Sequence, residues 1–234
     1  MGAKFSQGPV VPELKHLAGW SITKVEGKYT SFRRDADNPF FVTRPDYRRV
    51  FDVPKNVDKQ FKYFDPERKS RVSAFLIFGA VALLAQARPE QKLIFILSMV
   101  DLDFKRFLNR SEVCMAMRCA SLGLARAKQI DPPSVRRVET MAKAAFTDEH
   151  TRLNEQGEIS VADMSRYCTH EPEMLFYLID LASTRGADVA QLWRRQKELL
   201  LQLSEVEGKL ATLGVEVSAM HSDELHQHAA HAVK

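Results

Sequence analysis

The most constraining feature of this chain is a repeated unit in which an apolar run meets an acidic loop and a second apolar run follows. The unit occurs three times, most clearly over residues 90–120. Its apolar residues recur at helical spacing, so we expect a helix on each side of the loop. An Asp-x-Asp/Glu loop between two helices is the kind of segment that presents oxygen ligands to a hard cation. With no convincing run of alternating strand residues, the sequence predicts an all-α fold.

Four segments of the chain can be aligned as twelve-residue cation loops, here called the first to fourth loops. They are 35–46, 65–76, 101–112 and 152–163. In such loops the eighth residue is apolar, because paired loops meet there in a short strand contact. The eighth residues here are Val42, Val72, Leu108 and Ile159. The position that builds the paired structure is therefore intact in all four loops.

The third loop keeps the largest number of metal-ligand positions. These candidate ligands are Asp101, Asp103, Asn109 and Glu112. Calcium loops need an acceptor at the fifth position and glycine at the sixth, whereas this loop has Lys105 and Arg106. Two cations inside the loop oppose a dication that gains its affinity from carboxylate charge. We expect weak calcium binding at most, with Lys105 taking the place of the ion in an internal ion pair.

The other three loops depart further from a calcium site. The first loop has Phe40 at the glycine position, the second ends in Leu76, and the fourth opens with Arg152. Phenylalanine is poorly suited to a positive φ, leucine offers no oxygen, and arginine brings a like charge. The sequence therefore predicts helix–loop–helix packing from which calcium binding is largely lost, and we expect no bound cofactor.

These segments resemble the neuronal calcium sensor, or recoverin-like, group of EF-hand proteins. The stretches that carry the resemblance are FRRDADNPFFVTRPDYRRVF at 32–51, EQKLIFILSMVDLD at 90–103, HEPEMLFYLIDL at 170–181 and the N-terminal MGAKFS. The resemblance implies one pair of EF-hands within residues 1–88 and a second pair within 89–185.

In that family calcium opens an apolar groove that binds target helices. By resemblance, the groove residues here would be among Trp20, Phe32, Phe41, Phe51, Phe64, Phe75 and Phe78. Buried aromatic residues of an ordinary core would produce the same pattern. We take Phe75 and Phe78 as candidate partner-binding residues. The alternative is that both are ordinary core residues.

The N-terminal Met-Gly-Ala-Lys-Phe-Ser fits the pattern in which Gly2 is myristoylated after Met1 is removed. A single acyl chain anchors weakly, and no cysteine lies near Gly2 to carry a second one. The acyl group would insert into a membrane, or pack within the protein or a partner. We expect a cytoplasmic protein, with membrane, cytoskeletal or ciliary association as further alternatives.

Residues 186–215 are predicted to form a helix with an apolar seam at alternating three- and four-residue steps. The seam consists of Val189, Leu192, Gln196, Leu199, Leu203, Val206, Leu210 and Leu213. A narrow seam favours association with a partner or a second copy, whereas the alternative is a helix docked on the domain. Residues 216–234 are expected to form a histidine-containing flexible tail.

Several other functions find no support in the sequence. A net charge of +4 would suit an acidic partner or anionic membrane, but no basic run with interleaved aromatic residues indicates nucleic-acid binding. Phosphate-binding glycine loops, nucleophile elbows and zinc-protease motifs are all missing from the sequence, so we expect no enzyme activity. The longest apolar run, 74–85, is too short to span a bilayer.

The sequence thus predicts a non-enzymatic interaction or structural subunit. Its partner would be a protein, either a target helix or a cytoskeletal or ciliary assembly, bound through the apolar groove and the C-terminal helix. The alternative is a myristoylated calcium sensor that uses only the third loop.

The helix boundaries rest on residues that cap or break helices. Gly27 is predicted to precede a helix at 28–34, and Gly123 to end a helix that starts at Ser111. Ser134 is predicted to cap a helix that reaches about Phe146.

Overall fold

The computed structural model describes most of the chain. The described residues are 10–53, 56–149, 151–171, 174 and 206. Within them the protein is mostly helical, with eight α-helices, one 3-10 helix and four strands of two or three residues. All but Val206 belong to one compact unit, Met1–Val189. The predicted all-α class is confirmed at this level.

The elements follow one another in two runs of similar layout. The first run is η1 (Pro12–Gly19), α1 (Ile22–Asp35), β1 (Phe41–Thr43), α2 (Arg44–Val50), α3 (Val57–Phe64), β2 (Arg71–Ser73) and α4 (Ala74–Leu84). The second run is α5 (Pro89–Val100), β3 (Phe107–Leu108), α6 (Arg110–Lys128), α7 (Val135–Ala145), β4 (Ile159–Ser160) and α8 (Val161–His170).

The short strands join the loops in pairs. β1 runs antiparallel to β2 with Val42 opposite Val72, and β3 runs antiparallel to β4 with Leu108 opposite Ile159. These are the four eighth-position residues, and all four are buried. Two-stranded ribbons of this length are not stable alone. Burial of the central pair against the helices is therefore what holds each ribbon.

A cluster of aromatic rings fills the core between α1, α2 and α4. The Phe78 ring centroid lies 5.0 Å from that of Tyr29, 5.7 Å from Phe32 and 5.4 Å from Phe51. Tyr29 also meets Phe95 of α5 at 5.7 Å. One hydrophobic core therefore extends from the first run of elements into the second.

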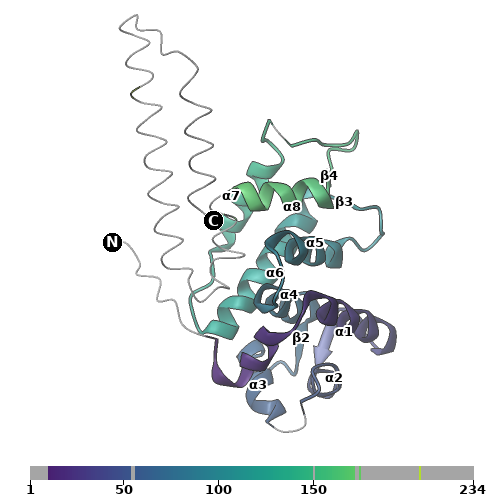
Figure 1. Cartoon of the computed structure of the whole chain (residues 1–234), viewed down its shortest axis with the longest axis vertical. Helices are drawn as coiled ribbons and strands as arrows, with labels where there is room; N and C mark the ends of the chain where they lie inside the picture. Colours follow the sequence, from purple (N-terminus) through teal and green to yellow (C-terminus); the bar gives the residue numbers. More distant parts are fainter. Residues whose placement is uncertain (1–9, 54–55, 150, 172–173, 175–205, 207–234) are drawn as a thin grey trace, which may run out of the picture. The chain divides into compact units, whose positions relative to one another are not determined.

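Helices α4 and α6 lie side by side at the centre of the unit (Figure 1) and make its most extensive helix–helix contact. Every residue of α4 is buried. A Cβ added to Gly123 would lie only 2.2 Å from the Leu76 carbonyl oxygen, and one added to Gly79 would lie 3.0 Å from the Ala120 Cα. Glycine at these two positions lets the two backbones approach closely.

Two predicted helix boundaries are wrong. Gly27 lies inside α1, which begins earlier because the Ser21 hydroxyl accepts a hydrogen bond from the Lys24 N–H at 3.2 Å. Gly123 lies inside α6, which continues to Lys128 because this glycine faces α4 rather than ending the helix. The segment Pro12–Gly19 forms a 3-10 helix that buries Leu14 and Leu17.

The Ser134 cap is confirmed, since its side chain accepts a hydrogen bond from the Arg137 N–H at the start of α7. The predicted C-terminal helix and histidine tail lie outside the described residues except for Val206, which is helical and half exposed. Gly2, Leu192, Leu199, Leu203 and Leu210 also lie outside them. Among the helices that are described, none combines the length and the apolar composition needed to cross a membrane.

We expect Gly123→Ala to lower the free energy of unfolding by about 1–3 kcal/mol, because the added methyl group overpacks the α4–α6 contact. The matched control is Gly27→Ala, where an added Cβ meets nothing within 4 Å. Alanine there should stabilise the helix by about 0.5–1 kcal/mol. Urea unfolding followed by circular dichroism measures both, and equal effects would contradict the close-packing account.

Candidate functional site

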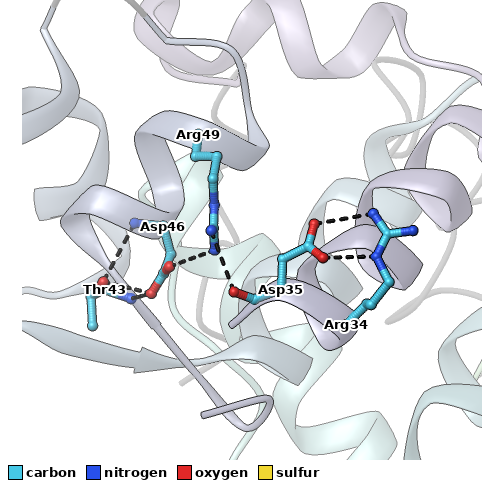
Figure 2. Close-up of polar contacts among 5 residues, drawn as sticks. All are labelled: Arg34, Asp35, Thr43, Asp46 and Arg49. Atoms are coloured by element: carbon cyan, nitrogen blue, oxygen red, sulfur yellow. Dashed lines mark hydrogen bonds and ion pairs between the residues drawn. The ribbon is translucent and has the colours of Figure 1, made fainter. Parts of the chain in front are cut away.

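The four loops form the candidate site, and the first of them carries an acid at each end. Asp35, at its start, is paired with Arg34: the guanidinium Nε donates to Oδ1 at 2.7 Å and Nη2 donates to Oδ2 at 3.2 Å (Figure 2). Hydrogen bonding to Arg34 lowers the pKa of the Asp35 carboxyl group below its ordinary value. Both side chains are exposed, so this pair adds little to stability.

At the other end of the loop, Asp46 caps helix α2. The Thr43 N–H and hydroxyl donate to Asp46 Oδ2 at 3.1 and 2.6 Å, and the Asp46 N–H donates back to the Thr43 hydroxyl. Arg49 Nη2 donates to Asp46 Oδ1 at 2.9 Å, while its Nη1 donates to the Asp35 carbonyl oxygen at 3.4 Å. Figure 2 shows this guanidinium between the two ends of the loop. The Arg49 guanidinium thus bridges Asp35 and Asp46, the first and last residues of the loop.

The fourth loop repeats the same arrangement at its end. The Ser160 hydroxyl donates to Asp163 Oδ2 at 2.8 Å, and the Asp163 N–H donates back to that hydroxyl at 3.0 Å. Arg166 Nη1 donates to Asp163 Oδ1 at 2.8 Å. Asp163, the final acid of this loop, is therefore also hydrogen-bonded within a helix cap and paired with an arginine one turn later. Gly157, at the sixth position, has φ +74°.

In the second loop the opening acid is satisfied by the backbone. The buried Asp65 carboxylate accepts hydrogen bonds from the Lys69 and Ser70 N–H groups, both at 2.8 Å. Ser70 has φ +63°, so this loop adopts the left-handed turn without glycine. Lys69 Nζ pairs with Glu67 at 2.5 Å, and Leu76 is buried within α4. The loop therefore turns tightly around the Asp65 carboxylate, and its last position offers no side-chain oxygen.

The third loop makes a similar turn. Asp101 is 5% exposed, and its Oδ2 accepts a hydrogen bond from the Arg106 N–H at 2.9 Å. Phe104 and Arg106 have φ of +60° and +61°. Non-glycine residues in this region carry backbone strain that the surrounding structure must offset. Asp101 Oδ1 is buried and accepts no hydrogen bond from any described residue.

The remaining candidate ligands of the third loop have partners of their own. Asn109 Oδ1 accepts from the Ser111 and Glu112 N–H groups at 2.9 and 3.1 Å, and Glu112 Oε2 accepts from the Asn109 N–H at 2.8 Å. This is a reciprocal cap that starts α6. Both side chains therefore serve the helix terminus.

Lys105 lies against the acidic side of the third loop. Its Nζ is 2.6 Å from Asp103 Oδ2, and this contact lowers the pKa of the Asp103 carboxyl group. The same contact raises the pKa of Lys105, with smaller contributions from the charges of Glu158 and Glu112. The ammonium group thus interacts with acids of both the third and fourth loops. No group of three or more His, Cys, Asp or Glu side chains is placed to hold a metal among the described residues.

The aromatic residues proposed for a target groove are almost all in the core. Those that are buried are Trp20, Phe32, Phe51, Phe64, Phe75 and Phe78. Phe41 alone among the seven is partly exposed. A partner could reach Phe75 or Phe78 only if the helices that cover them separated.

Sequence reasoning missed the roles of Arg49 and Arg166. Their signal is present in the sequence as Thr/Ser-x-x-Asp-x-x-Arg, at 43–49 and 160–166. A capping hydroxyl three residues before an acid, followed by arginine one turn later, predicts an acid that is already paired.

Comparison with models of known protein families gives no match, and comparison with curated proteins gives none either.

We expect Lys105→Asp combined with Arg106→Gly to create calcium binding in the third loop, with a Kd of about 10⁻⁷–10⁻⁵ M. The pair of substitutions adds a ligand, removes two cations and relieves the positive φ. The matched control is Lys69→Asp with Ser70→Gly in the second loop, which still ends in Leu76. Calorimetric titration should show uptake in the first variant only; equal uptake in both would contradict this account.

The lowered pKa values of Asp35 and Asp103 predict a pH dependence. Since the folded-state pKa is lower than the unfolded value near 3.8, this stabilisation is present above that value and is lost as the pH falls through the folded pKa. We expect a small decrease in the temperature of half-unfolding when the pH is lowered below about 4, because both ion pairs are exposed. Arg34→Gln with Lys105→Gln should weaken that dependence, whereas Arg48→Gln with Arg136→Gln, at exposed positions, should not.

Proposed function

We propose that this chain is a non-enzymatic interaction or structural subunit built from two pairs of EF-hand-like units that have largely lost calcium binding. The supporting observation is the register of the loops. In each pair the eighth residues lie opposite one another, as Val42 does to Val72. The tenth residue then donates its N–H to the carbonyl of the sixth residue in the partner loop: Ala74 to Phe40 at 2.9 Å, and Val161 to Arg106 at 3.0 Å.

The contacts of the loop acids support the loss of calcium binding. Arg34, Arg49, Lys105 and Arg166 each pair with a carboxylate at a ligand position. A cation attached to the chain is always present at its site, whereas calcium would have to displace it and also overcome the like charge. Such loops hold their helices in one arrangement, which suits a constitutive adaptor.

We propose that the partner is a protein, and that residues 186–215 provide the main contact. This follows from the predicted seam, which includes Leu199 and Leu203, and from the burial of Phe75 and Phe78. A target helix or a cytoskeletal or ciliary assembly would be the partner class. The proposed location is cytoplasmic, and myristoylated Gly2 would add a membrane contact.

One observation favours a second candidate, a myristoylated calcium sensor that uses the third loop. Asp101 Oδ1 is a buried acceptor that no described residue satisfies, and a bound cation would satisfy it. Glu112 is also present at the position of the bidentate ligand.

A calcium titration of the full chain separates the two candidates. For the adaptor we expect the same unfolding midpoint in 1 mM CaCl₂ and 1 mM MgCl₂. A sensor with a Kd one hundredfold lower than the calcium concentration would be stabilised by about 2.7 kcal/mol. Scanning calorimetry with tryptophan fluorescence measures the difference, and a calcium-specific rise in the midpoint would overturn the adaptor proposal.

The C-terminal contact is tested by charges placed on and off the predicted seam. We expect Leu199→Glu with Leu203→Glu to remove the partners that co-purify with the full chain, as deletion of 187–234 also should. Leu200→Glu with Leu201→Glu adds the same charge outside the seam and should leave those partners bound. Loss in both variants, or in neither, would argue against the seam.

A further inference from the structure

A groove with a volume of about 660 Å³ lies where α1, α5 and the third loop meet. Its wall on α1 includes Tyr29 and Arg33, its wall on α5 includes Ile94 and Phe95, and the loop contributes Phe104. We call it the α1–α5 groove. Phe75 and Phe78 do not line it, although Tyr29 and Phe95 belong to the same hydrophobic core.

The groove carries two arginines without a carboxylate partner. Arg33 and Arg106 line it, and neither forms an ion pair within the described part of the chain. The Arg33 guanidinium lies 5.9 Å from the Tyr29 ring and 5.6 Å from the Phe104 ring. Stacking against two rings holds it in place while leaving its N–H donors for an anion.

An apolar surface lies beside these cations. Phe104 is 71% exposed and has a positive φ, and Ile94 is 38% exposed. An exposed aromatic ring in a strained backbone conformation, beside a second exposed apolar side chain, offers apolar area that a ligand can cover. The exposed ring therefore marks the edge of the groove as a contact surface.

The acids of the groove restrict the ligand. Asp101 and Glu26 also line it, so a small inorganic anion would meet two carboxylates as well as the arginines. A peptide can instead place its carboxylates on Arg33 and Arg106 and an apolar side chain on Phe104. Separated cations around an apolar floor favour such a ligand over a free phosphate.

We propose that the α1–α5 groove binds an acidic peptide segment of a partner protein, whose carboxylates pair with Arg33 and Arg106 and whose aromatic or aliphatic side chain covers Phe104 and Ile94. This inference rests on the proposed function as an interaction subunit. It names the chemistry of a second contact, separate from residues 186–215.

The test is a selection from a random display library of twelve-residue peptides on the full chain. We expect enrichment of peptides that combine Asp or Glu with an aromatic or leucine residue. Arg33→Gln with Arg106→Gln should abolish this enrichment, whereas Arg48→Gln with Arg136→Gln removes equal charge elsewhere and should preserve it. Fluorescence anisotropy of the most enriched peptide should show binding at least tenfold weaker to the first variant. Phe104→Ala should also weaken it.

Three results would overturn the proposal: no enrichment of acidic peptides, equal enrichment on the Arg33/Arg106 variant, or binding that Phe104→Ala leaves unchanged. Sedimentation with vesicles that contain phosphatidylserine checks the other source of anionic groups. If the arginine pair governs vesicle binding but not peptide binding, the groove is a lipid site instead. A chain that keeps its partners through Leu199 and Leu203 but selects no acidic peptide would disprove the groove alone. A chain that neither retains partners through Leu199 and Leu203 nor selects acidic peptides would disprove the proposed function.

Discussion

The close contact between α4 and α6 is the interaction on which the rest of the unit depends. Helix α4 follows the second loop and α6 follows the third. Because these loops belong to different strand pairs, the packing of α4 on α6 joins the β1–β2 pair to the β3–β4 pair. Because Gly79 and Gly123 carry no side chain, the backbones approach within contact distance. The ring cluster around Phe78 then fills the space between α4 and the helices of the first pair.

Within the loops, the apolar centres and the acids have separate roles. Their apolar centres remain buried, whereas their acids serve as helix caps or pair with nearby cations, as Asp46 does with Thr43 and Arg49. Packing of the strand pair needs only the apolar residue and the main-chain hydrogen bonds. Ion binding needs uncommitted carboxylates converging on one point. The two requirements are physically independent, so one can be lost while the other persists.

Much of the local structure was predictable because it depends on short-range physics. The cap at Ser134 and the opposition of Leu108 and Ile159 match the expectation from sequence. The errors at Gly27 and Gly123 share one cause. Glycine is weakly unfavourable within a helix, by about 1 kcal/mol relative to alanine, and packing of the flanking apolar residues outweighs that amount. Local helix propensity at a glycine does not indicate which neighbouring helix will pack against it.

The sequence by itself determined the helical class, the four loops with their apolar eighth residues and the cations within them, because these follow from periodicity and residue type. Only the tertiary structure decided that Arg49 also reaches the Asp35 carbonyl at the other end of its loop, and that Arg33 stands beside Phe104 at an open groove. Those facts join residues from different helices and loops. Their geometry is set by how the helices pack, and packing is a property of the whole unit rather than of any segment.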